Sequence, residues 1–269
     1  MKYCFYYDGK ARNLPKVDEV ILKYKKNTPD LIRYCQEADE NVRVIADLTV
    51  FEEEDITYDI LTSAASAHKN FAVLLDIEHQ MDIALTLRES MVKVFFTYIC
   101  DTWDKLFSCI LAGASDVYVC GELAFSMKKV HGVCSSRNVQ VRVFPNVCQL
   151  NSKVNNLNKV TSFFIRPEDL QYYEDYIDVI EFFGSMEKQS VLFDIYKEHK
   201  GWKGDVNELI LDCGPGMDVP NRNIWESFGK NRVDCGKGCN YNKCTLCYDI
   251  FSLAKTIEKK KLEREEADE

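Results

Sequence analysis

Residues 92–120 read VKVFFTYICDTWDKLFSCILAGASDVYVC and contain the clearest structural unit of the chain. The first seven residues are rich in β-branched and aromatic side chains, which favours a strand. Asp101 or Thr102 then offers a helix N-cap. Apolar residues follow at helical spacing: Trp103, Leu106, Phe107, Ile110 and Leu111. Gly113 stands where this helix would end, and Asp116–Cys120 is the next short apolar strand, so the stretch predicts a strand–helix–strand unit.

The same alternation continues on both sides of this unit. Eight β-prone runs can be counted: Lys2–Tyr7, Val42–Ala46, Phe71–Leu75, Val92–Tyr98, Asp116–Cys120, Val141–Phe144, Ser162–Ile165 and Val179–Phe183. Helical patterns separate most of them, including one that starts at about Val17. Short continuous apolar strands between helices indicate a parallel sheet buried on both faces. Eight strands favour an α/β fold of the closed (β/α)8 TIM-like type over an open doubly wound sheet.

The composition is that of a globular chain. Its 269 residues are 46% hydrophobic, and an α/β barrel commonly uses ~250 residues as one domain. The formal net charge is −9, which disfavours non-specific binding to a nucleic-acid backbone. The first ten residues lack a signal-peptide core, and no apolar run is long enough to span a membrane. With 12 cysteines and no signal, we expect a reduced, cytoplasmic protein that uses most of these cysteines as small apolar side chains.

The character of the sequence changes near Cys213. Residues 213–223 are rich in Gly, Pro, Asp and Asn, which predicts a loop, and a cysteine cluster follows. Asp249 begins a predicted helix with a charged tip, which is either a solvated surface or a contact surface for a partner. We therefore expect an α/β barrel over 1–212, and a cysteine-rich metal-binding segment with a C-terminal helix over 213–269.

Four cysteines stand close together in the segment CGKGCNYNKCTLC: Cys235, Cys239, Cys244 and Cys247. Thiolates are ligands that suit zinc and iron–sulfur clusters, and four of them complete a tetrahedral shell. Gly236 and Gly238 let the backbone turn tightly around an ion. A dithiol redox pair would need only Cys244 and Cys247 and would leave the other two cysteines unexplained. The spacing therefore predicts a metal site.

The predicted metal is Zn²⁺, with a [4Fe–4S] cluster as the alternative. Zinc would act as a structural staple for a Gly-rich segment that has little core of its own. A cubane cluster also takes four cysteines, often at compact spacing. Cys213 is a further possible ligand, although an ordinary loop cysteine is the simpler interpretation.

Polar residues follow many of the predicted strands, where a barrel places its active site. They are Asp47, Asp76, Glu78, Asp101, Glu122, Asn146, Gln149, Arg166 and Glu181. Glu122 and Arg166 are the preferred catalytic candidates, because each closely follows a buried-looking strand. Arg166 would bind an anionic group of the substrate, and Glu122 would serve as an acid or base. Each of these residues also fits an ordinary loop position.

Three segments resemble the collagenase-like peptidase family, whose relatives include iron–sulfur RNA and quinone hydroxylases. They are LAGASDVYVCGELA at 111–124, VRVFPNVCQ at 141–149 and FIRPED at 164–169, within a resemblance that extends from Val42 to Tyr196. The resemblance implies a TIM-type barrel that binds substrate at its mouth and carries cluster-binding cysteines. In that family the cysteines are spread over a longer segment, whereas here four are packed together near the end of the chain.

Two functions from different classes fit these features. The first is a metal-containing barrel enzyme that acts on a small or RNA-linked anionic substrate. The second is a non-catalytic scaffold with a structural zinc site and an acidic surface for a protein partner. Because a fold does not fix a function, the sequence leaves both open.

Overall fold

A computed structural model describes most of the chain. The described residues are 1–7, 16–24, 30–97, 99–121, 123–145, 164–209 and 219–235, with 249, 252–253, 255–257, 259–260 and 263–264 near the C-terminus. Every described residue from 249 to 264 is helical, in agreement with the terminal helix expected there.

The described strands form one parallel sheet that curls until its two edge strands lie near each other. Its order is β5-β4-β3-β2-β1-β9-β8-β7-β6. The strands are β1 Lys2–Tyr7, β2 Glu19–Lys23, β3 Arg43–Asp47, β4 Phe71–Asp76, β5 Val94–Thr97, β6 Ile99–Cys100, β7 Asp116–Val119, β8 Gln140–Val143 and β9 Val179–Phe182. The first and last strands of this order, β5 and β6, are separated in the sequence by Tyr98 alone. The sheet is therefore a nearly closed barrel, and counting β5 with β6 gives the eight strands of a TIM-like fold.

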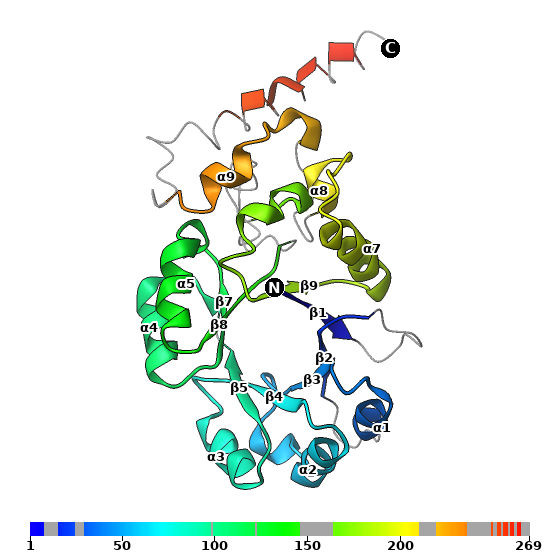
Figure 1. Ribbon diagram of the computed structural model, residues 1–269, viewed down its shortest axis with the longest axis vertical. Helices are drawn as coiled ribbons and strands as arrows, with labels where there is room; N and C mark the ends of the chain where they lie inside the picture. The colour runs from blue at the N-terminus through cyan, green and yellow to red at the C-terminus, as the bar shows by residue number, and fades with distance from the viewer. Residues whose placement is uncertain are drawn as a thin grey trace.

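Helices surround the barrel on its outer side, as Figure 1 shows. They are α1 Asp30–Glu37, α2 Tyr58–Ala67, α3 Met81–Glu89, α4 Trp103–Leu111, α5 Met127–Ser135 and α7 Met186–Lys197. Short 3-10 turns lie at η1 Glu53–Asp55, η2 Leu123–Phe125, η3 Pro167–Tyr172 and η4 Asn221–Asn223. The main apolar core lies between these helices and the outward-facing strand residues. Among the described residues, no helix combines the length and apolar character needed to cross a membrane.

Helix α4 begins and ends as its sequence predicts. Thr102 is the N-cap, and its hydroxyl accepts from the Lys105 amide at 3.5 Å. Gly113 follows the end of the helix with a φ of +85°, a left-handed conformation that glycine adopts without strain. The helix buries Leu106 and Cys109 against the barrel. The strand–helix–strand unit that suggested the fold is therefore confirmed.

Two predicted elements differ from the structure. The helix expected from Val17 is wrong, because residues 19–23 form strand β2 between β1 and β3. The strand expected at Ser162–Ile165 falls partly outside the described residues, and its described part, Phe164 and Ile165, is buried but lies in no strand. Phe164 packs instead on the ring of Phe228, with the centroids 5.9 Å apart.

Residues 206–209 and 219–235, which we call the C-terminal part, pack on the barrel between α5 and α7. Figure 1 shows α8 (Val206–Leu209) and α9 (Phe228–Arg232) there. Val219, Ile224, Phe228 and Val233 belong to the same apolar core as the outer faces of the strands. The amide of Met127, at the start of α5, donates to the Val233 carbonyl at 3.2 Å. Residues 219–235 are thus attached to the barrel wall, while the expected boundary at 212/213 lies outside the described residues.

Candidate active site inside the barrel

The barrel interior has an apolar part and a charged part. Alternate strand residues point to the axis, since successive side chains of a strand point to opposite faces. The apolar part is small and consists of Cys4, Ile21, Ile45, Ala72, Leu74 and Val179. Several strands begin instead with a charged residue at an inward position: Lys2, Glu19, Arg43 and Asp116. The charged part therefore lies toward the N-terminal end of the barrel.

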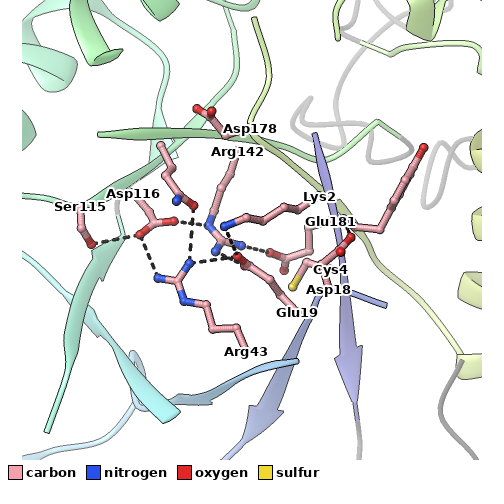
Figure 2. Close-up of polar contacts among 12 residues, drawn as sticks. Lys2, Cys4, Asp18, Glu19, Arg43, Ser115, Asp116, Arg142, Asp178 and Glu181 are labelled. Atoms are coloured by element: carbon pink, nitrogen blue, oxygen red, sulfur yellow. Dashed lines mark hydrogen bonds and ion pairs between the residues drawn. The ribbon is translucent and has the colours of Figure 1, made fainter. Parts of the chain in front are cut away.

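Arg142, the third residue of β8, is the centre of the charged part (Figure 2). Its Nη2 donates to Glu19 Oε2 at 2.5 Å, and its Nε donates to Asp116 Oδ1 at 2.7 Å. All three side chains are at most 2% exposed. Removing one partner of such a buried pair costs roughly 3–5 kcal/mol, because the other charge is left without compensation. These contacts tie β2, β7 and β8 together across the interior.

A second arginine balances the two acids. Arg43 Nη1 lies 3.0 Å from Glu19 Oε1, and Nη2 lies 3.6 Å from Asp116 Oδ2. Its guanidinium also lies 3.5 Å from the centre of the Phe95 ring. Burial opposes ionisation of Glu19, but Arg142 and Arg43 outweigh it, so the pKa of Glu19 lies below its usual value. We name Glu19, Asp116, Arg142 and Arg43 the interior ion cluster.

Glu181 lies beside this cluster, on β9, and has a different environment. It is 2% exposed, Tyr118 Oη donates to its Oε2 at 2.5 Å, and Arg142 Nη1 lies 3.6 Å from the same oxygen. Both contacts are made by Oε2 of Glu181 and not by Oε1. Burial raises the pKa of Glu181 to about 7, although Arg142 and the Tyr118 hydroxyl act in the opposite direction. This carboxyl therefore exchanges a proton near neutral pH, unlike Glu19.

Aromatic side chains lead from Glu181 toward the C-terminal end of the barrel. Tyr118 stacks on Phe144 with the ring centroids 4.7 Å apart and an interplanar angle of 4°. Phe144 meets Phe183 edge to face at 6.3 Å, and Phe183 meets Tyr6 at 5.6 Å. Phe183, directly after β9, is 44% exposed, so this row of rings runs from the buried acid to the surface.

Asp47, at the C-terminal end of β3, is held by its neighbours. Its Oδ2 accepts from Tyr6 Oη at 2.9 Å, and its Oδ1 accepts from the Thr49 amide and hydroxyl at 3.0 and 2.6 Å. The carboxylate of Asp47 also contributes to the raised pKa of Glu181, after burial. Two acids thus face the same region, and one of them is fixed in place by three hydrogen bonds.

Two buried glutamines support the strand ends near this region. Gln189 of α7 accepts from the Tyr6 amide at 2.9 Å and donates to the Tyr6 and Gly184 carbonyls, each at 2.7 Å. Gln80 accepts from the Asp76 amide at 2.7 Å and donates to the carbonyls of Leu48 and Phe51. Such side chains satisfy backbone groups at positions where a strand has ended.

The structure places Arg166 outside the barrel interior, in the wall beside the C-terminal part. Its Nε and Nη2 donate to Asp169 Oδ2 and Oδ1 at 2.5 and 2.8 Å. Further contacts join Arg166 to Asn221 Oδ1 at 3.3 Å and to the Trp225 carbonyl at 3.4 Å. Arg166 is 2% exposed, and these bonds attach η3 to residues 221–225.

The other predicted mouth residues have varied positions. Glu122, Asn146 and Gln149 lie outside the described residues. Asp76 accepts from the Glu78 amide at 2.7 Å, and Asp101 pairs with Lys105 at 2.8 Å on α4. Whether Glu122 and Arg166 share a pocket therefore stays a prediction.

Of the predicted metal ligands, only Cys235 lies among the described residues. It is partly exposed and lies beyond the end of α9, and its amide donates to the Arg232 carbonyl at 3.2 Å. Cys239, Cys244 and Cys247 lie outside the described part of the chain. The described residues contain no group of three His, Cys, Asp or Glu side chains placed to hold a metal ion.

Sequence reasoning included Glu181 among the strand-end residues but did not identify Glu19, Asp116, Tyr118 or Arg142. The sequence nevertheless contains a pattern that indicates these four residues. Each is a polar residue inside an otherwise apolar strand, at the inward parity of EVILK, DVYV or QVRV. A charge at such a position must be paired within the barrel.

No family model matches the sequence, and no curated protein matches it. Solved structures with a similar fold include phosphoribosyl anthranilate isomerase from Thermotoga maritima, at 12% identity and a TM-score of 0.47, covering 73% of this chain and 98% of that one. Tryptophan synthase from M. tuberculosis has 11% identity and a TM-score of 0.47, with 77% and 90% covered. Tryptophan synthase subunit alpha from Legionella pneumophila str. Paris has 11% identity and a TM-score of 0.45, with 74% and 86% covered. Similarity at this level assigns no functional residue, so the site rests on the geometry of this chain.

Proposed function

We propose that this protein is a barrel enzyme in which Glu181 transfers a proton to or from a small molecule bound at the C-terminal end of the strands. The observation that carries the proposal is the environment of Glu181. It is a buried carboxyl with a pKa of about 7, bonded to the Tyr118 hydroxyl and close to the barrel axis. A catalytic acid or base works best when its pKa lies near the operating pH.

The surrounding residues fit distinct tasks in this proposal. Tyr118 orients the carboxyl by donating to Oε2, which leaves Oε1 to exchange the proton with the substrate. Arg142 stabilises the ionised form, since its Nη1 lies 3.6 Å from Oε2. The rings of Phe144 and Phe183 offer apolar surface along the way to the solvent. Strongly shifted carboxyl groups gather at active sites, although structural networks also produce them.

The resemblance to the collagenase-like peptidase family remains part of this proposal. Two of its segments, 111–124 and 141–149, contain Asp116, Tyr118 and Arg142, which contact one another or Glu181. The resemblance therefore involves strands that build the candidate site. It names no substrate for this chain.

We also propose that Cys235, Cys239, Cys244 and Cys247 bind Zn²⁺, with a [4Fe–4S] cluster as the alternative. The donor set supports this, because four thiolates suit either group. Cys235 follows the end of α9, and its amide donates to the carbonyl of the buried Arg232. A zinc ion there would stabilise the segment that follows α9, and no step of the proposed proton transfer passes through it.

A turnover screen tests the enzyme proposal. Wild type, Glu181→Gln and Glu89→Gln are each incubated with a pool of small molecules, and consumption is followed by mass spectrometry. We expect at least one compound to be consumed by wild type and by Glu89→Gln, whose altered side chain is exposed at the end of α3, but not by Glu181→Gln. Consumption that is equal in all three proteins would remove Glu181 from the mechanism. If wild type consumes no compound of the pool but binds a protein partner, the non-catalytic scaffold is favoured.

A further inference from the structure

Two thiols touch each other in the wall of the barrel, on the side away from the axis. Cys100 is the last residue of β6, and Cys109 lies in α4. Their Sγ atoms are 3.8 Å apart, and the residues are 0% and 3% exposed. This pair belongs neither to the interior ion cluster nor to the four cysteines predicted to bind metal.

We propose that Cys100 and Cys109 form a reversible disulfide when the protein meets a peroxide. The Cys109 thiolate attacks one peroxide oxygen and breaks the O–O bond, giving a sulfenic acid and hydroxide, which takes up a proton to become water. The sulfur of Cys100 then attacks the sulfenic sulfur, and the thiol proton of Cys100 leaves with the displaced hydroxide as a second water, so the S–S bond forms. Two thiols and one hydrogen peroxide become one disulfide and two waters, and the two electrons lost by sulfur reduce the peroxide.

The environment of the pair distinguishes it from the other buried cysteines. The hydrogen bond from the Cys100 thiol lowers the pKa of Cys109 against the opposing effects of burial, Glu78 and Asp76, with a smaller favourable contribution from Lys105, and the same contact raises the pKa of Cys100. Burial raises the pKa of Cys35 and Cys134 to about 12. Because the thiolate is the reactive form, Cys109 is the favoured nucleophile, and it already touches its resolving partner.

The position of the pair gives the bond a structural effect. Among the described residues, strand β6 pairs with β7 through two residue pairs, Ile99 with Tyr118 and Cys100 with Val119. Strand β6 is the last strand in the sheet order, next in the sequence to β5, the first strand, so this is the point at which the barrel closes. A Cys100–Cys109 disulfide would fasten this short strand to α4 and protect its backbone from opening.

Peptide mapping tests the proposal. The full chain is treated with increasing hydrogen peroxide, blocked with an alkylating reagent, and digested before aspartate without reduction. The fragments 82–100 and 104–115 each contain one cysteine, Cys100 and Cys109 respectively. We expect a linked species of these two fragments that appears before Cys35 or Cys134 is modified and disappears after treatment with dithiothreitol.

Two variants keep the result decisive. In Cys109→Ser the linked species should vanish, and Cys100 should resist peroxide as Cys35 does. Cys134→Ser, which removes another buried thiol of the outer layer, should leave the linked species unchanged. The proposal is overturned if folded wild type shows no 82–100/104–115 link while the C-terminal cysteines are fully oxidised. It is also overturned if Cys100 links to another cysteine equally well.

Discussion

The hydroxyl of Tyr118 lies 2.5 Å from Oε2 of Glu181, and both side chains are at most 5% exposed. Tyr118 is on β7 and Glu181 on β9, with β8 between them in the sheet. The bond therefore spans an intervening strand and depends on the correct closure of this side of the barrel. Its direct consequences can be measured without knowledge of a substrate.

Glu181→Gln should change how stability depends on pH. The folded-state pKa of about 7 lies above the ordinary 4.5, so the folded protein favours the protonated carboxyl. This contribution is fully present below about pH 4.5 and is lost as the pH rises through about 7. Relative to the variant, wild type should lose on the order of 3 kcal/mol over that window, as urea unfolding at successive pH values will show. Glu78→Gln serves as the control, and equal pH profiles for wild type and Glu181→Gln would contradict the assignment.

Tyr118→Phe should raise the pKa of Glu181 further. The phenol donates to the carboxylate and so favours its ionised form, and the variant loses that bond. Infrared difference spectra recorded across a pH titration follow the protonated carboxyl directly. Tyr58→Phe, which alters a partly exposed hydroxyl on α2, should leave the titration unchanged. A midpoint that stays or falls in Tyr118→Phe would show that this bond does not tune Glu181.

Arg142→Met should destabilise the barrel by roughly 3–5 kcal/mol, because Glu19 and Asp116 lose their closest cation while they remain buried. Arg33→Met is the matched control. Its ion pair with Asp30 is exposed and should contribute only about 0–1 kcal/mol. Denaturant midpoints of the two variants provide the comparison, and similar small losses in both would mean that the interior ion cluster is not structural.

Gly229→Ala tests the attachment of the C-terminal part to η3. A β-carbon at this position of α9 would overlap the carboxylate of Asp169, which Arg166 holds in a two-point ion pair. We expect a loss of about 1–3 kcal/mol in thermal or chemical unfolding. Gly132→Ala in α5 meets nothing within 4 Å and should be neutral or stabilising by up to ~1 kcal/mol. If the two alanines behave alike, α9 does not pack on Asp169 as described.

Protein purified without oxygen should contain about one zinc ion, or one iron–sulfur cluster, per chain. Cys244→Ser should lose that metal, whereas Cys35→Ser, which alters a buried thiol of α1, should retain it. Elemental analysis measures the content, and visible absorbance separates a coloured cluster from colourless zinc. Zinc and iron both at background level in wild type would exclude the predicted site.

The periodicity of the sequence was sufficient to predict the barrel, although two short runs were assigned to the wrong element. Residues 19–23, EVILK, and the pair Phe164–Ile165 are both short and largely apolar, and periodicity alone does not separate a buried strand of this length from a buried segment of helix. Only the partners decide between them. Residues 19–23 pair with β1 and β3, whereas Phe164 packs under α9. The two differences offset each other, so the expected number of strands agrees with the structure.

The candidate site was harder to predict than the fold. Arg166 is charged and follows an apolar run, but Asn221 and Trp225, which it contacts, lie far away in the sequence and give no local signal. Arg142 and Glu19 contact each other across 123 positions of sequence. Strand parity shows that both point inward, but only the register of the closed sheet shows that they meet.

The pairing of β1 with β9 joins two segments that are synthesised far apart in time. While the ribosome is still synthesising the first half of the chain, β1 has β2 beside one edge, and its other edge has no partner until residues 179–182 emerge. An unpaired strand edge is a template for aggregation. The nascent chain therefore carries an open edge at β1 until residues 179–182 are available to pair with it, and that edge is exposed to association with other chains during this time.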